Sequence, residues 1–254
     1  MAKRKNDAAV LAGERQAGRW AAAAGLGSLV ATVASVVVGN AASAGTGLSA
    51  GPTGSGGEDD DRLRALVDFH EHVGLMAAST ALRALSLLLM VVVGLYVIRL
   101  VRTRDARQVQ PWLPALTWAA PIVLCAMLAV GFVASADVAS TLTGDGAATA
   151  ERAKQLVDDS VGLAVADVGG VLLRVPMAFW VAFLAIAAMR VGLLTRFLGY
   201  WGVAAGVCLV LLAGSGDALL VGWIGSVGVL ASGYWPGGRP AAWDSTRPEP
   251  IEAI

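Results

Sequence analysis

The chain has 254 residues, of which 56% are hydrophobic and only 15% are charged. Because charged residues make up about one quarter of a typical soluble domain, this composition excludes an ordinary soluble globular protein and indicates a membrane protein. The formal net charge of zero gives no electrostatic basis for binding nucleic acid, so we expect no nucleic-acid partner.

Continuous apolar runs dominate the chain. A transmembrane helix needs about 20 apolar residues, because it crosses about 30 Å of hydrocarbon at about 1.5 Å per residue. Barrel strands are only about half as long, so the runs predict an all-α fold. The last two runs are short, and Gly214-Ser215-Gly216-Asp217 between them indicates a tight hairpin. We therefore predict a polytopic transmembrane helical bundle with six spans, at residues 21–40, 79–98, 115–135, 169–189, 197–213 and 218–235.

Basic residues alternate with acidic ones from one inter-span segment to the next. Positive residues mark the cytoplasmic ends of spans, so their distribution orients the chain in a cell inner (plasma) membrane with both termini cytoplasmic. The predicted cytoplasmic parts are the basic tail 1–20, the Arg-rich loop 99–114, the turn 190–196 and the tail 236–254. The predicted outer parts are the loops 41–78 and 136–168 and the turn 214–217.

The first span permits a second interpretation. A basic segment and an apolar stretch precede Ala42-Ser43-Ala44, which is the layout of a signal peptide cleaved at Ala44. Small residues recur on one helical face of this span, a pattern that instead favours close packing against a neighbouring span. The sequence leaves both alternatives open. The small residues are Ala24, Ser28, Ala31 and Ser35.

Both large outer loops are predicted to contain short amphipathic outer helices. Residues 41–57 are mainly Gly, Ser and Ala, so we expect this part of the first loop to be flexible. A run of aspartates then precedes an apolar stripe, which predicts a helix from about Asp61. The segment 148–165 has a similar pattern, and we expect both helices to lie over the outer end of the bundle.

Four charged residues within or beside the spans form the main candidate site. Ionisable groups in apolar spans are costly, so each is by default a functional hypothesis. Arg83 and Arg174 lie at similar depth near the outer surface, and Asp137 and Asp167 lie at the outer ends of their spans. Two arginines can hold an anionic group bidentately, which predicts an outward-facing polar pocket. Alternatively, the arginines reach the headgroups or pair with the aspartates for structure alone.

Two further groups of residues are weaker candidates. His70 and His72 are two residues apart and face opposite sides of a helix, whereas a helical metal pair needs a spacing of three or four. We expect His70 to be an interior residue of the apolar stripe, and we expect no metal and no cofactor. Cys125 and Cys208 fall in the middle of spans, where they are expected to pack as small apolar residues.

The predicted hairpin contains two other motifs. Its turn matches the Gly-x-Gly-Asp signature of intramembrane aspartyl proteases, whose chemistry needs two carboxylates that share a proton. No second aspartate is embedded in the span before Asp217, which counts against this interpretation. Gly202 and Gly206 have the spacing of a close helix contact, either within the hairpin or between protomers.

Two segments resemble known membrane proteins. Residues 192–206, which read GLLTRFLGYWGVAAG, resemble the turn between two spans in a family of uncharacterised six-span bacterial membrane proteins. Residues 234–243, which read YWPGGRPAAW, look like the ending of many uncharacterised actinobacterial membrane proteins. The resemblance implies a location and a lineage, and it carries over no functional residue.

The sequence therefore favours a non-enzymatic membrane protein. One possible role is the binding or transport of a small solute through the predicted outward-facing pocket. Another is that of a membrane partner protein, which associates with a second copy or a different membrane protein through the Gly202 and Gly206 face. The alternative is an intramembrane aspartyl-type hydrolase that uses Asp217.

Overall fold

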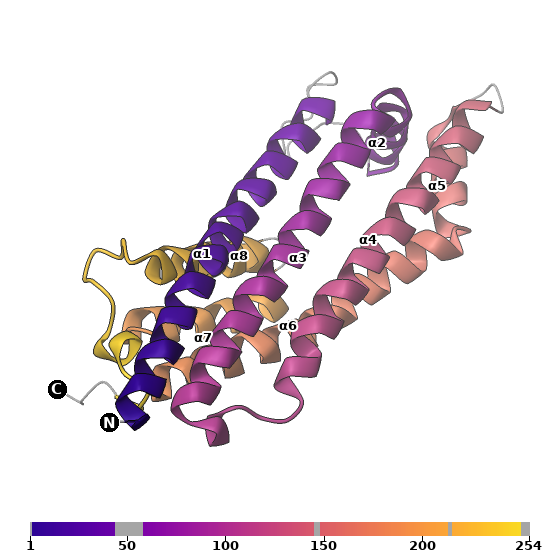
Figure 1. The fold of residues 1–254 in the computed structure, drawn as a ribbon. Helices are drawn as coiled ribbons and strands as arrows, with labels where there is room; N and C mark the ends of the chain where they lie inside the picture. The colour runs from indigo at the N-terminus through magenta and orange to yellow at the C-terminus, as the bar shows by residue number, and fades with distance from the viewer. Residues whose placement is uncertain (1, 44–57, 145–147, 213–214, 250–254) are drawn as a thin grey trace. The chain divides into compact units, whose positions relative to one another are not determined.

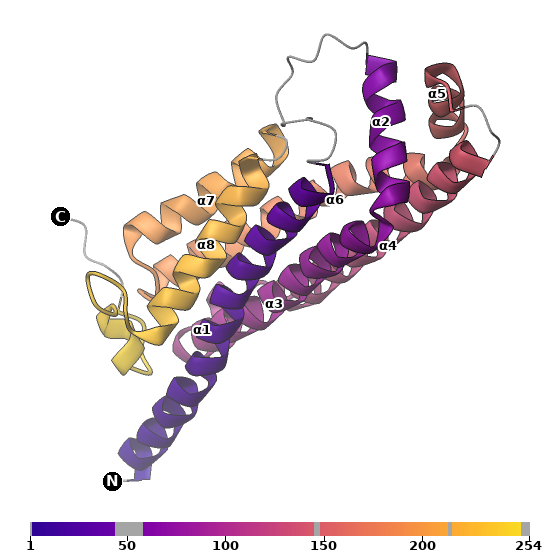
Figure 2. The same ribbon diagram turned by 90° about the horizontal axis from the view of Figure 1, so that it is seen from above.

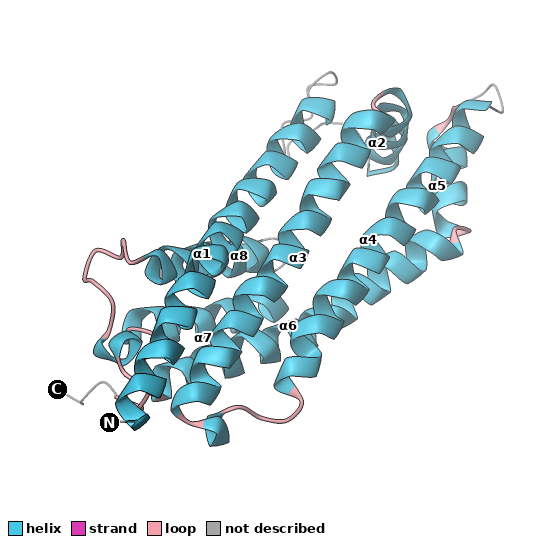
Figure 3. Ribbon diagram, viewed as in Figure 1, coloured by secondary structure: helices cyan, strands magenta, loops and turns pink. Residues whose placement is uncertain are grey.

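The structure is a computed structural model, and it describes residues 2–43, 58–144, 148–212 and 215–249 (Figure 1). Within these residues it contains helices and loops and no strand, which confirms the all-α prediction (Figure 3). The helices are α1 (Ala2–Ser43), α2 (Glu58–Glu71), α3 (Val73–Arg104), α4 (Leu113–Gly144), α5 (Ala150–Asp158), α6 (Val161–Arg190), α7 (Arg196–Leu211) and α8 (Ser215–Ser232). Two short 3-10 helices cover Ala106–Gln108 and Ala241–Asp244.

Helices α1, α3, α4 and α6 are long and apolar enough to cross a membrane, and they are the long helices in Figures 1 and 2. This finding supports the prediction of a membrane protein. Helices α7 and α8 are apolar but have only 16 and 18 residues, which corresponds to about 24 and 27 Å. Their lengths alone do not establish two more crossings of about 30 Å of hydrocarbon.

The long helices extend well beyond the spans that hydropathy predicts. Helix α1 includes residues expected in a basic tail, and α4 continues to Gly144. The predicted outer turn 214–217 differs most, because α8 begins at Ser215 and Asp217 therefore lies in its first turn. Two segments predicted as loop or cleavage site, residues 44–57 with Ala44 and residues 145–147, lie outside the described residues. Hydropathy marks the lipid-buried part of a helix, whereas protein contacts stabilise its ends.

The described chain forms two compact units. Unit 1 comprises Met1–Val30, Ser86–Ile122 and Leu173–Ile254, and unit 2 comprises Ala31–Leu85 and Val123–Leu172. Helices α1, α3, α4 and α6 each contribute residues to both units.

Tryptophans and glycines organise the core of unit 1. The buried Trp180 indole donates a hydrogen bond of 2.9 Å to the Thr117 hydroxyl, which joins α6 to α4. Gly94 of α3 lies against both side chains, because a Cβ atom there would be 2.7 Å from the Trp180 ring. Helices α7 and α8 pack side by side as a hairpin, as Figure 2 shows. The Trp223 indole joins them through a 2.8 Å hydrogen bond to the Leu198 carbonyl.

The small-residue face of α1 is buried, as its spacing predicts. Ala24, Ser28, Ala31 and Ser35 are each 5% exposed or less. In unit 1 the hydroxyls of Ser28 and Ser86 are 2.8 Å apart. In unit 2 the Ser79 hydroxyl donates a 2.9 Å hydrogen bond to the Ser35 carbonyl. Two small-residue contacts thus pack α1 against α3.

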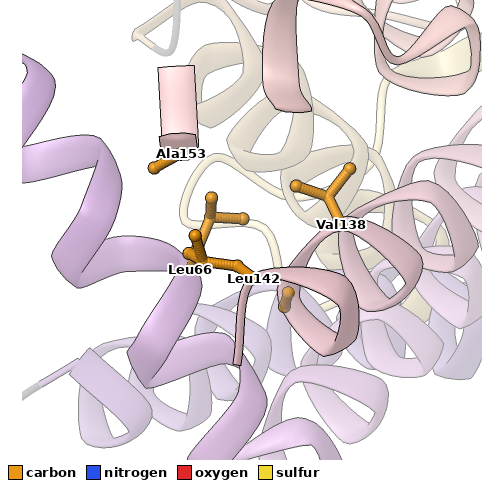
Figure 4. Close-up of a cluster of buried hydrophobic side chains, with 5 residues drawn as sticks. Leu66, Val138, Leu142 and Ala153 are labelled. Atoms are coloured by element: carbon orange, nitrogen blue, oxygen red, sulfur yellow. The ribbon is translucent and has the colours of Figure 1, made fainter. Parts of the chain in front are cut away.

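Unit 2 contains a cluster of apolar side chains from α2, α4 and α5. Leu66, Val138, Ala139, Leu142 and Ala153 are buried in it, and Figure 4 shows Leu66 and Leu142 facing Ala153. Phe69 of α2 also contacts Phe132 of α4, with ring centroids 5.5 Å apart. The two helices predicted in the outer loops therefore pack against each other and against the end of α4.

Candidate functional site

The four charged residues predicted to form one pocket are divided between the two units. Arg83 of α3, Asp137 of α4 and Asp167 of α6 belong to unit 2, and each is exposed. Arg174 of α6 belongs to unit 1 and is half-buried. Of these four residues, only Asp137 lines the groove described below.

Arg174 has an acidic neighbour within unit 1. Its guanidinium Nη2 lies 4.0 Å from the Asp217 carboxylate Oδ2, and both side chains are partly exposed. The beginning of α8 therefore lies level with Arg174, which is about 24 Å along α6 from Arg190. Among the described residues the charged neighbour of Asp217 is thus a guanidinium.

A groove of about 790 Å³ in unit 2 is a candidate site. One wall is a single face of α4, and the opposite wall is the end of α5 with the first residues of α6. The two walls meet at Gly162, where a Cβ atom would lie 2.7 Å from the Cβ of Ala134. The lining residues are Ala129, Val130, Val133, Ala134, Asp137, Val138, Thr141, Leu156, Asp159, Ser160, Val161 and Gly162. The volume falls within the range of about 300–1,000 Å³ typical of small-molecule sites.

The groove has four polar side chains, which are two hydroxyls with hydrogen-bond partners and two carboxylates. The Thr141 hydroxyl donates a 3.0 Å hydrogen bond to the Asp137 carbonyl, and the Ser160 hydroxyl accepts one of 3.3 Å from the Leu163 backbone N–H. Both hydroxyls thus have partners within the protein. Asp137 and Asp159 supply two carboxylates, and within the part of the chain that the structure describes neither has an ion-pair partner.

The groove rests on the apolar cluster of Figure 4. Val138 belongs to both, and Leu156 lines the groove and packs against the cluster. Helix α5, which ends at the groove, is capped by Thr149, whose hydroxyl accepts a hydrogen bond from the Arg152 backbone N–H. These contacts fix the end of α5 next to α4, so the groove is built into the packing of unit 2.

Sequence reasoning identified Asp137 but missed Asp159 as a site residue. Asp159 follows the last turn of α5, and its backbone N–H donates to the carbonyls of Gln155 and Val157. Its proximity to α4 depends on how the apolar side of α5 packs. The amphipathic pattern of 148–165 was the available signal, because it predicts that one side of this helix is buried.

A second polar cluster, in unit 1, has no local sequence signal. Arg104 at the end of α3 forms a bidentate ion pair with Glu14 of α1, with N–O distances of 3.0 and 3.1 Å, and the two side chains are 0% and 6% exposed. The Arg104 Nε donates to the Ala242 carbonyl at 2.9 Å, and the Thr103 hydroxyl donates to the Glu14 carboxylate at 2.8 Å. Every polar atom named here is satisfied within the cluster, which indicates a structural role.

Residues 235–249, which we call the C-terminal strap, pack against several helix ends of unit 1. Arg239 donates to the carbonyls of Leu230 and Ala231 at the end of α8, and its guanidinium lies 5.3 Å from the Trp243 ring centroid. The Trp243 indole donates a 2.8 Å hydrogen bond to the Leu193 carbonyl in the turn between α6 and α7. Gly192 in this turn has a φ of +80°, a conformation that favours glycine.

The loop between α3 and α4 contains a carboxylate, Asp105, whose pKa is shifted. The Asp105 carboxylate accepts hydrogen bonds from the Gln108 side-chain amide and the Arg107 backbone N–H, at 3.1 and 3.0 Å. These donors stabilise the charged form and hold the pKa of Asp105 below its usual value. The carboxylate thereby caps the 3-10 helix Ala106–Gln108.

The glycine pair predicted to mediate helix packing lies at intramolecular contacts. A Cβ atom at Gly202 would lie 2.6 Å from the Ala185 Cβ and 2.8 Å from the Trp223 ring. A Cβ atom at Gly206 would lie 2.8 Å from the Ala178 carbonyl oxygen. Both glycines therefore let α7 approach α6, and Gly202 also accommodates α8.

The histidines and cysteines form no metal or redox site among the described residues. His70 is exposed, so its expected interior position is wrong; Asp68 is the buried polar residue of this turn. The His72 Nδ1 lies 3.3 Å from the Asp68 carbonyl oxygen. Cys125 and Cys208 are free and half-buried.

Comparison of the chain with models of protein families, with curated proteins and with solved structures gives no match.

Proposed function

We propose that this chain is a six-span protein of the plasma membrane with both termini in the cytoplasm. Four helices have the length and composition of spans, and α7 and α8 form an apolar hairpin. Basic residues flank the ends that we assign to the cytoplasm. Contacts within unit 1 support the same-side assignment, because the beginning of α1, the end of α3, the α6–α7 turn and the C-terminal strap contact one another.

The same contacts indicate whether the first span is retained or is cleaved as a signal peptide. Cleavage at Ala44 would remove Glu14 and leave the guanidinium of Arg104 buried without its carboxylate, an arrangement that costs about 3–5 kcal/mol. Cleavage would also expose the faces of α3 that contact Ser28 and Ser35. We therefore assign α1 as a retained span.

The biochemical role that the geometry supports best is non-enzymatic binding of a small solute, as a carrier or a receptor, in the groove of unit 2. The observation that carries this proposal is a preformed groove of about 790 Å³ with an apolar lining and two carboxylates. In the proposed topology the groove lies at the outer end of α4, so it opens to the outside. Apolar walls with a few polar groups are the usual composition of a small-molecule site.

Thiol labelling of intact cells tests whether the groove is open to outside water. Val133 lines the groove, whereas Val123 is an exposed residue of the same helix outside it. In a background with Cys125→Ala and Cys208→Ala, we expect V133C to react with a membrane-impermeant maleimide and V123C to remain unlabelled. If V133C reacts no faster than V123C, the groove faces lipid or protein and the solute-binding proposal is wrong.

A further inference from the structure

The groove of unit 2 also indicates the charge of its ligand. We propose that it binds an amphipathic organic cation, whose positive group contacts Asp137 and Asp159 and whose apolar body lies along α4. This inference rests on the proposed function, because it names the class of molecule for the same groove. It replaces the expected anionic ligand, which would need the predicted pocket arginines Arg83 and Arg174 at the site.

The charges of the lining carry the argument. Asp137 and Asp159 are its only ionisable residues among those that the structure describes, and no basic residue lines the groove. The Thr141 hydroxyl already donates its proton to the Asp137 carbonyl, whereas the Ser160 hydroxyl accepts from the Leu163 backbone N–H and keeps its own O–H as a donor. An ionised carboxylate only accepts hydrogen bonds, so the complementary ligand group is a donor or a cation. An anionic group would face two full negative charges, against which the lining offers only the Ser160 hydroxyl and the partial positive charge at the beginning of α6.

The apolar residues define the other part of the ligand. Ala129, Val130 and Val133 continue the lining along α4 beyond Asp137, on the side towards the middle of the helix. A bulky apolar group bound there would contact alanine and valine side chains while its charge remained near the outer end. A small inorganic cation would leave this surface without a partner, and the described residues contain no group of His, Cys, Asp and Glu that could hold a metal ion. The lining therefore favours an organic cation.

Aryl probes of positive, negative and zero charge separate the contribution of the charge from that of the apolar body. The protein is reconstituted in nanodiscs of uncharged phosphatidylcholine, and equilibrium dialysis measures binding of tetraphenylphosphonium, tetraphenylborate and triphenylphosphine oxide. We expect saturable binding of the phosphonium cation and at least tenfold weaker binding of the anion and the uncharged oxide. Asp137→Asn and Asp159→Asn should each weaken phosphonium binding about fivefold, the upper range for one exposed ion pair.

Matched variants complete the experiment. Asp158→Asn removes an exposed carboxylate next to Asp159 but outside the groove, so it should leave phosphonium binding unchanged. Val133→Trp should block the groove, whereas Val123→Trp on the same helix should not. Asp137→Glu keeps the charge and should retain binding, which separates loss of charge from misfolding.

Three results would overturn the inference. Equal binding of the three probes, insensitive to Asp137→Asn, would leave the groove as a binding site and disprove the cation preference. Phosphonium binding that survives Val133→Trp would place the cation elsewhere. Absence of saturable binding by any of the probes would also refute the cation preference, while the labelling of V133C would still decide separately whether the groove is open to solutes.

Discussion

Two ion pairs in unit 1 have the same length but opposite environments. Arg104 and Glu14 are 3.0 Å apart with side chains 0% and 6% exposed, whereas Arg15 and Asp244 are 3.0 Å apart with side chains 64% and 69% exposed. Water screens the exposed pair, so its contribution to stability is below about 1 kcal/mol. The buried pair is not screened by water. Removing one partner leaves the other charge buried without its partner, which lowers the stability of the protein much more.

This contrast predicts different effects of two arginine substitutions. Arg104→Ala should lower the free energy of unfolding by about 3–5 kcal/mol, because Glu14 remains buried and the Ala242 carbonyl loses its donor. Arg15→Ala should lower it by less than about 1 kcal/mol. Unfolding of the purified protein in detergent micelles, followed by circular dichroism, measures both. Equal losses would show that the Glu14–Arg104 pair is solvated in the protein.

At the scale of elements, helices α1 and α8 cross with little space between their backbones. A Cβ atom at Gly25 of α1 would lie 2.9 Å from the Cα of Gly228 and 2.9 Å from the carbonyl oxygen of Ile224. Side chains larger than hydrogen would force the helices apart here. Such small-residue crossings are a principal source of helix association in lipid, because they allow close van der Waals packing.

The crossing predicts that replacing glycine by alanine has different effects on stability at two positions of α1. Gly25→Ala should destabilise the protein by about 1–3 kcal/mol, because the methyl group overpacks a backbone contact. Gly13→Ala meets no atom within 4 Å, so it should be neutral or stabilise by up to about 1 kcal/mol through helix propensity. Thermal unfolding in detergent compares them. A stabilising Gly25→Ala would mean that α1 and α8 are farther apart.

Sequence patterns predicted these elements unevenly. Long apolar runs predicted the helices, and the recurrence of small residues predicted the buried face of α1 with Ser28 and Ser35. The partner of that face, α3, was not identifiable, because two serines so far apart along the chain carry no pairing signal. The Glu14–Arg104 pair spans 90 residues, and Glu14 lies in a segment that hydropathy alone predicts as a solvated tail.

For the candidate site too, the sequence identified some residues and missed others. Asp137 was identifiable because a charge at the end of an apolar run stands out. Asp159 and the groove were not, because they depend on α5 packing through Ala153 and Leu156 onto the end of α4. The contact of Arg174 with Asp217, which the α7–α8 hairpin brings to it, was not predicted. Tertiary packing thus determined which charges meet.

At the scale of the whole molecule, contacts within unit 1 constrain the topology of the chain. Glu14 contacts Arg104, Arg104 contacts Ala242, and Trp243 contacts Leu193. In the proposed topology each of these residues lies outside the spans, so two that contact each other are on the same side of the membrane and the chain crosses it an even number of times between them. Helices α1 and α3 lie between the first pair, and α4, α6 and the α7–α8 hairpin lie between the second.

Labelling of single cysteines tests this constraint and the orientation separately. In the background lacking Cys125 and Cys208, R102C of α3 and S245C of the C-terminal strap should react with an impermeant maleimide only after the cells are permeabilised. A150C at the start of α5 should react in intact cells, because an odd number of spans separates it from both. Reaction of R102C and S245C from opposite sides would disprove the contacts of unit 1. Reaction of both in intact cells, with A150C protected, would preserve the contacts but reverse the orientation inferred from basic residues, and the groove lined by Asp137 would then open to the cytoplasm.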